Sequence, residues 1–190
     1  MSDELEAVEA ALPAEVPEHY AEVPDDYRGL DLLWRTCQRV TRRGNELVPR
    51  QYWERPEAAL TAILMGRELG LGDMTALQRI YVFDGKVVLA AELVRGLVRR
   101  AGHSLVYDER STEVCTITGR RHDTGDTMSV TWSIDQATKA GLAGKGPWTK
   151  YPRAMLDARA TTELARALFS DCIGWAAYAP SDFTEEEPTS

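Results

Sequence analysis

The sequence predicts an α+β domain, in which helices pack with a small antiparallel sheet and a long helix lies near the C-terminus. Three observations indicate this class. Apolar residues recur at helical spacing in several segments, Asp84-Gly85 separates two β-rich runs as a two-residue hairpin turn does, and three strand-like stretches follow. A chain of 190 residues is long enough for one domain with tails and can bury a core without disulfides or metal.

Apolar periodicity places the helices. A first helix is expected from about Arg28 to Val40, with Gly44 as its cap, and a second from Pro56 to Leu69. After the hairpin of residues 80–89, a helix, three strands and a long helix are expected at 91–101, 104–107, 113–118, 127–132 and 152–169.

Two features lie between the last strand and the long helix. Ser133 and Gln136 are spaced as a capping box for a short helix that ends at Gly141. The segment 142–151 is then expected to be a loop.

Charge is segregated along the chain. Residues 1–27 hold nine acidic residues and no Lys or Arg, and residues 181–190 hold four acidic residues and no Lys or Arg. The whole chain has a formal net charge of −8, yet residues 28–180 carry 22 basic and 17 acidic residues, a net of +5. We therefore expect acidic, disordered tails over 1–27 and 180–190 around one folded domain over 28–179.

The expected domain is thus basic, and 18 of its 22 cationic residues are Arg. A guanidinium offers phosphate a planar fork and can stack on bases. Nucleic acid or another polyanion is therefore one interpretation. Arg-richness that follows a GC-rich genome, with solvating tails, is the other.

The patterns that bond-making chemistry needs are missing from the sequence. There is no phosphate-loop motif, no H-E-x-x-H and no G-x-S-x-G, and Cys37, Cys115 and Cys172 lack zinc spacing. We therefore predict no enzyme and no cofactor; Mg²⁺ is compatible with the sequence but not indicated by it. No apolar run reaches the roughly 20 residues of a membrane helix. The absence of a signal-peptide pattern and the three dispersed cysteines predict a reduced, cytoplasmic setting.

The stretch 145–153 interleaves cations, aromatics and prolines. Single-stranded nucleic acid binding uses cations to meet phosphates and aromatics to stack on bases, and the candidates here are Lys145, Trp148, Lys150, Tyr151 and Arg153. Pro152 suits the first position of the long helix, whose free amide groups favour phosphate. The alternative is that the aromatics pack this stretch onto the core, which is the favoured interpretation for Trp148.

Further cations lie on the helices and at the hairpin. In the long helix, Arg159 and Arg166 lie within roughly 20° of each other, whereas Arg153 is rotated by about 120° and serves the helix start. The other candidates for a shared basic groove are Arg79, Lys86, Arg95 and Arg99. A solvated face explains any one of these residues, but not several that converge on one groove.

Three sequence blocks occur in order: Gly66–Leu71, Ala76–Lys86 and, the strongest, Gly146-Pro147-Trp148 with Tyr151-Pro152-Arg153, Met155-Leu156, Arg159-Ala160, Ala165-Arg166, Phe169 and Asp171. In order and spacing they resemble the RecT-type single-strand annealing proteins of phage recombination systems, relatives of Red-beta. The resemblance covers about residues 46–178.

The resemblance implies an ATP-independent protein that binds single-stranded DNA and promotes pairing of complementary strands through an annealed duplex intermediate. It implies a homo-oligomer, a ring or a helical filament, that holds the backbone in a positively charged groove and leaves the bases open. Arg153 and Arg159 match positions that contact the DNA backbone in the family. Arg166 matches a further position of the same helix, and Lys86 is a weaker match.

The resemblance also implies partners. An exonuclease or a host single-strand binding protein would be contacted in the bacterial cytoplasm, and no membrane is involved. Family members often carry a C-terminal module after the annealing core, whereas an acidic stretch follows here.

Two other functions are compatible with the residues. A protective single-strand binding protein would coat DNA and slow pairing. A regulatory domain would use its acidic tails to mimic DNA or recruit a partner, and would bind no DNA at moderate salt. Strand pairing distinguishes the three functions.

Overall fold

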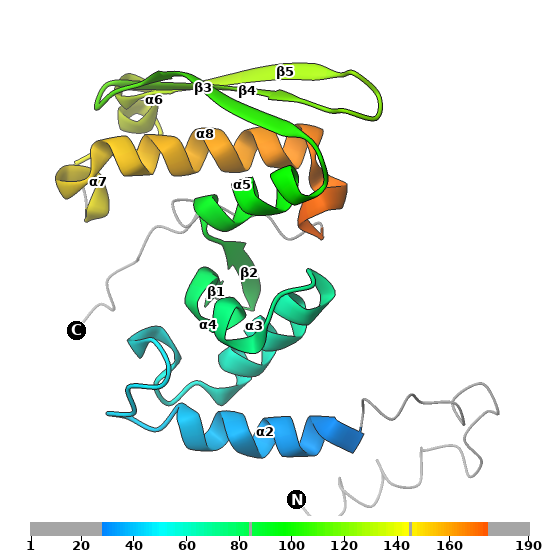
Figure 1. Ribbon diagram of the computed structural model, residues 1–190. Helices are drawn as coiled ribbons and strands as arrows, with labels where there is room; N and C mark the ends of the chain where they lie inside the picture. Colours follow the sequence, from blue (N-terminus) through cyan, green and yellow to red (C-terminus); the bar gives the residue numbers. More distant parts are fainter. Residues whose placement is uncertain (1–27, 84, 145, 175–190) are drawn as a thin grey trace, which may run out of the picture. The chain divides into compact units, whose positions relative to one another are not determined.

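The computed structural model describes residues 28–83, 85–144 and 146–174 (Figure 1). Both expected tails, Asp84 of the hairpin turn and Lys145 lie outside the described residues. The chain divides into two units, residues 1–36 and 37–190. Among the described residues, no helix is long and apolar enough to cross a bilayer.

The helices and strands confirm the predicted α+β class. Helix α2 spans Arg28–Val40. The next elements are η3 (Arg50–Tyr52), α3 (Pro56–Glu68), α4 (Asp73–Arg79), β1 (Ile80–Phe83), β2 (Lys86–Leu89) and α5 (Ala91–Arg100). The last are β3 (Ser104–Arg110), β4 (Val114–Arg120), β5 (Thr127–Ser133), α6 (Ile134–Lys139), α7 (Pro147–Lys150), α8 (Pro152–Leu168) and η4 (Ser170–Ile173).

The strands form two separate antiparallel sheets. β1 and β2 make the predicted hairpin, with Ile80 opposite Leu89 and Phe83 opposite Lys86. Gly85 in the turn has a φ of 72°, the left-handed conformation that such a turn requires. β3, β4 and β5 make the predicted meander in that order, and the hairpin does not join it.

Strand β3 runs to Arg110, beyond its expected end at Tyr107. Its pairing with β4 shifts register between Tyr107 and Glu109, which marks a bulge. The sequence did not predict the second half of this strand, because Arg110 and its neighbours are polar and give no clean alternation of apolar and polar residues.

The main core lies between the three-stranded sheet and α8. Figure 1 shows α8 running along one face of this sheet, with α5 packed against α8 and β3. Cys115 and Ile117 of β4 are buried there with Leu164. A Cβ on Gly119 would lie 2.7 Å from the Phe169 ring, so glycine allows the helix to approach the strand closely.

Local signals set several helix ends as predicted. The Gln136 backbone N–H donates to Ser133 Oγ at 3.2 Å, and the Ser133 backbone N–H donates to Gln136 Oε1 at 2.7 Å. These two bonds complete the capping box of α6. Gly102 follows α5 with a φ of 88°, a conformation that other residues adopt only at a cost.

The expected loop at 142–151 is wrong in part, because it contains α7. Pro147 is the first residue of α7, and Pro152 is the first residue of α8. Proline favours the first position of a helix because its missing N–H would have no partner there. One helical turn is too short to show apolar periodicity, so the sequence pattern did not indicate it.

Candidate nucleic-acid interface

The second half of helix α8 exposes a stripe of side chains. Side chains around most of the helix are buried: Leu156, Asp157, Ala158, Ala160, Thr161, Thr162, Leu164 and Ala165. Glu163 and Arg166 are exposed and Arg159 is half-buried. At about 100° per residue these three positions lie within about 60° of one another, so the stripe carries two cations and one anion.

An aromatic ring of the neighbouring strand supports Arg159. The Arg159 guanidinium lies over the Trp132 ring of β5, 4.8 Å from its centre, a favourable cation–π contact. Trp132 Nε1 donates to Glu163 Oε2 at 2.6 Å. Both contacts join β5 to α8 and hold the stripe in place.

The electrostatics of this stripe favour an anion. Burial lowers the pKa of Arg159, the nearby Arg166 lowers it further, and Glu163 raises it. Arg159 still carries its charge at neutral pH, because the ordinary pKa of arginine is above about 12. A phosphate beside both guanidinium groups would reduce their mutual repulsion.

The junction between α7 and α8 carries further exposed cations, of which Arg153 is rotated by about 120° from Arg159. Lys150 and Arg153 are exposed there, and Tyr151 exposes 64% of its surface. We name Lys150, Tyr151, Arg153, Arg159 and Arg166 the α8 track. At 1.5 Å per residue, Arg153 and Arg166 are about 20 Å apart along the helix axis, the length of about six nucleotides at 3.4 Å spacing.

Trp148 does not belong to this surface. The residue is 6% exposed and belongs to the core cluster that contains Leu142 and Leu156. The prediction that Trp148 stacks on a base is therefore corrected, because the buried ring offers no face to one. Its packing role is confirmed.

Arg95 and Arg99 of α5 lie at the other edge of the sheet. Arg95 Nη1 donates to the Tyr107 hydroxyl at 2.9 Å, and Arg99 Nη2 donates to the Leu105 carbonyl at 3.5 Å. Both partners are in β3, whereas Arg159 lies over a ring of β5. Arg95 and Arg99 therefore do not share a groove with Arg159.

The hairpin carries the remaining predicted cations. Arg79 forms an ion pair with Glu92 at 2.9 Å, and Lys86 is exposed at the start of β2. Beside them the rings of Tyr81 and Phe83 are stacked, with centroids 6.4 Å apart. The sequence analysis missed this aromatic pair, although two aromatics at i and i+2 of a strand share one face.

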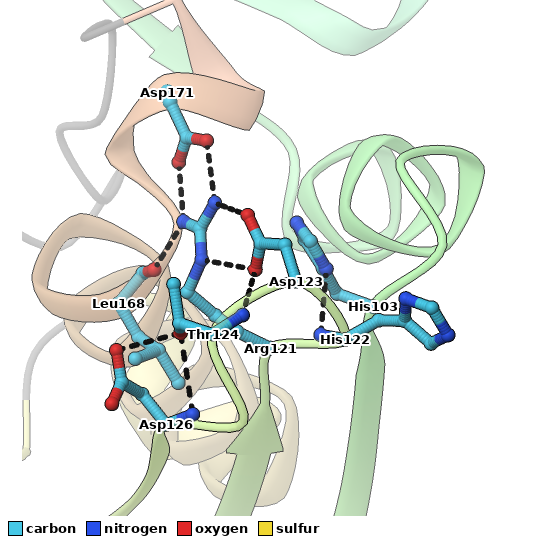
Figure 2. A network of polar contacts seen from close by, with 8 residues as sticks. All are labelled: His103, Arg121, His122, Asp123, Thr124, Asp126, Leu168 and Asp171. Carbon is cyan, nitrogen blue, oxygen red and sulfur yellow. Dashed lines mark hydrogen bonds and ion pairs between the residues drawn. The ribbon is translucent and has the colours of Figure 1, made fainter.

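Arg121 fastens the C-terminal end of α8, a role that the sequence analysis did not predict. Figure 2 shows its guanidinium between two carboxylates: Nη2 lies 2.7 Å from Asp123 Oδ2 and 2.8 Å from Asp171 Oδ2. Nη1 donates to the Leu168 carbonyl at 3.0 Å. This network joins α8 and η4 to the turn between β4 and β5.

The same network shifts the acid–base properties of its members. Hydrogen bonds from Arg121 lower the pKa of Asp171 to about 2 and hold the pKa of Asp123 well below its usual range. The two carboxylates in turn raise the pKa of Arg121. The three groups therefore stay charged at neutral pH.

Potential metal ligands meet beside this network. Ligand atoms of His103, Asp171 and Cys172 lie within 4.8 Å of one another. Both Asp171 oxygens contact Arg121, and His103 Nδ1 accepts the His122 amide at 3.2 Å. These contacts account for the histidine and the carboxylate as packing and ion-pair groups, so we assign no metal here, and the absence of a cofactor stays a prediction.

Comparisons with known proteins leave the family open. No protein-family model matches the chain, and no curated protein matches it. The function is therefore inferred from the residues, their geometry and the resemblance of the three sequence blocks.

Proposed function

We propose that the protein binds single-stranded DNA and anneals complementary strands without ATP, as in phage-type homologous recombination. The α8 track is the observation that supports this proposal. It sets Arg153, Arg159 and Arg166 along one helix, in the block that most resembles the RecT-type annealing proteins.

The chemistry of the α8 track suits a DNA backbone. Guanidinium groups bind phosphate through paired hydrogen bonds, and the exposed Tyr151 ring can stack on a base at the helix start. Cations that hold the backbone leave the base edges open to a second strand. They also screen the repulsion between two phosphate backbones, so complementary tracts can test pairing.

The small charge of each protomer argues for assembly. A protomer that neutralises about three phosphates binds weakly alone and loses affinity steeply with salt. Many protomers on one strand would raise the overall affinity through effective concentration. We therefore propose a ring or helical filament in the bacterial cytoplasm, with an exonuclease or a host single-strand binding protein as the partner.

An annealing assay tests the proposal. Two complementary fluorescent oligonucleotides are mixed with protein, without nucleotide, at 50 and 200 mM salt. Arg153→Gln/Arg166→Gln removes two exposed cations of the α8 track. Arg42→Gln/Arg43→Gln removes two exposed cations outside it and is the matched control.

The expected result is faster pairing with the wild-type protein and with the control, and loss of the acceleration in the α8 variant. Binding with slower pairing would indicate the protective function instead. Absence of binding at 50 mM salt would contradict both and would turn attention to a regulatory role of the acidic tails.

A further inference from the structure

The bulge in β3 turns Arg110 toward α8. Before the bulge, the side chains on the α8 face are at Leu105 and Tyr107, opposite Gly119 and Ile117. Alternation would place the next one at residue 109. The extra residue moves this position to Arg110, opposite the buried Cys115. Bulges commonly redirect a side chain in this way.

A buried carboxylate holds Arg110 there. Arg110 Nε donates to Asp157 Oδ2 at 2.6 Å, and Nη2 lies 2.5 Å from the same oxygen. The Asp157 side chain is 7% exposed, whereas that of Arg110 is 47% exposed. A guanidinium has five N–H donors, so Arg110 keeps donors for an anion in solvent.

Arg95 and Arg110 both contact the ring of Tyr107. Their guanidinium carbons lie 5.6 and 4.9 Å from the ring centre. The Tyr107 hydroxyl also contacts Thr161 Oγ1 of α8 at 3.1 Å. Arg99 donates to the Leu105 carbonyl, so the three arginines lie along β3 from residue 105 to residue 110, about 17 Å at 3.4 Å per residue. We name Arg95, Arg99 and Arg110 the β3 track.

The β3 track has a local excess of positive charge. Asp157 balances one of its three cations, and burial raises the pKa of the Tyr107 hydroxyl, which keeps it neutral. The neighbouring carboxylates of β3 lie on the other face of the sheet: Asp108 accepts from Thr118, and Glu109 stands opposite Thr116. Within the part of the chain that the structure describes, Arg95 and Arg99 donate to the neutral Tyr107 hydroxyl and Leu105 carbonyl rather than to a carboxylate.

The β3 track and the Arg159–Arg166 part of the α8 track lie on opposite sides of α8, whereas Arg153, one turn before Asp157, lies nearer the β3 side. Tyr107 of β3 contacts Thr161, whereas Trp132 of β5 contacts Glu163. Two residues along a helix correspond to about 200° of rotation, and a helix with its side chains is about 10–12 Å wide. A strand whose backbone lies along Arg159 and Arg166 is therefore on the opposite side of α8 from the β3 track.

We propose that the β3 track binds the phosphates of a second single strand, separate from the strand held by Arg159 and Arg166 of the α8 track. This inference rests on the proposed function and adds to it that one protomer holds two strands. Guanidinium groups already fixed by Tyr107 and Asp157 lose little further freedom when a phosphate binds, which suits the capture of a strand before its bases have paired.

A sequential capture experiment tests this inference. Full-length protein is loaded on an immobilised dT oligonucleotide, washed, and given a fluorescent dT strand. Because the strands cannot pair, capture of the second strand reports the protein alone. Arg95→Gln/Arg99→Gln is the main variant, because neither arginine pairs with a buried carboxylate. Arg110→Lys, which keeps the charge beside Asp157, is the second.

The expected result separates the two tracks. Counterion release gives about 0.7 logarithmic units per phosphate contact at 0.1 M salt relative to 1 M, so loss of two contacts weakens second-strand capture about 25-fold. First-strand affinity of the main variant should stay within about twofold of the wild-type value. Arg110→Lys should weaken second-strand capture without changing first-strand affinity. The Arg42→Gln/Arg43→Gln control should change neither step.

Three outcomes would overturn the inference. Unchanged second-strand capture in Arg95→Gln/Arg99→Gln would show that the β3 track is not used. Equal loss of both steps would show a single shared site. Binding of a first strand but no second by the wild-type protein would refute the inference and leave the proposed function standing, whereas binding of neither strand would refute both.

Discussion

The salt dependence of single-strand binding gives the sharpest test of the α8 track. For single strands, the logarithm of the affinity falls with the logarithm of salt concentration by about 0.7 per phosphate contact. If Arg153, Arg159 and Arg166 each neutralise one phosphate, the slope is about 2.1 per protomer. Between 50 and 200 mM salt the affinity then falls about 18-fold.

Arg153→Gln/Arg166→Gln reduces this number of contacts to one. The slope should fall to about 0.7, and the same rise in salt should weaken binding only about 2.6-fold. Both arginines are exposed, so the variant should keep the thermal stability of the wild type. Arg159 is left in place because it packs on Trp132, and its removal would mix a stability effect with a binding effect.

The assay is fluorescence anisotropy with a labelled dT oligonucleotide, short enough for one protomer, over a salt series. Arg42→Gln/Arg43→Gln lowers the net charge by the same amount and should retain the slope of about 2.1. An unchanged slope in the α8 variant would refute the assignment. An equal decrease in both variants would show that the total charge of the protein, rather than the α8 track, governs binding.

Three further predictions concern the fold that positions the tracks. Gly119→Ala should destabilise the protein by about 1–3 kcal/mol in urea unfolding, because the new Cβ would meet the Phe169 ring at 2.7 Å; Gly96→Ala, which meets no atom within 4 Å, should not, and equal effects would contradict this packing. The pKa of Asp171 is lowered to about 2 in the folded state, so its contribution to stability is present above about pH 4 and is lost as pH falls toward 2. Asp171→Asn should therefore lose less stability between pH 5 and pH 2.5 than the wild type, and identical losses would exclude this role. Burial raises the pKa of the Cys115 thiol to about 12, so a thiol reagent at pH 8 should modify Cys115 only at the rate of unfolding, measured by mass spectrometry; modification as fast as in the denatured chain would contradict its burial.

The sequence was informative wherever a few adjacent residues decide the structure. Asp84-Gly85 predicted the hairpin, whose strands have the expected bounds. Ser133 with Gln136 predicted the capping box, and Gly102 the end of α5. Turns and caps depend on local backbone preferences and local hydrogen bonds, so they can be read from a short window of sequence.

The grouping of the arginines required the tertiary structure. The helical period aligned Arg159 with Arg166, but the ring beneath Arg159 comes from β5, distant in the chain. The burial of Trp148 depends on α8 and the residues after α6, so its sequence context alone left two interpretations open. Arg110 gave no signal, because a bulge reverses the face on which a strand residue lies.

The amino-acid sequence by itself therefore determined the class of elements, their order and the basic character of the expected domain. The tertiary structure decided which cations share a surface: it set Arg159 beside β5, and Arg95, Arg99 and Arg110 beside β3. The physical reason is that helix and turn signals act over a few residues, whereas a phosphate-binding surface depends on which edge of the sheet each helix packs against.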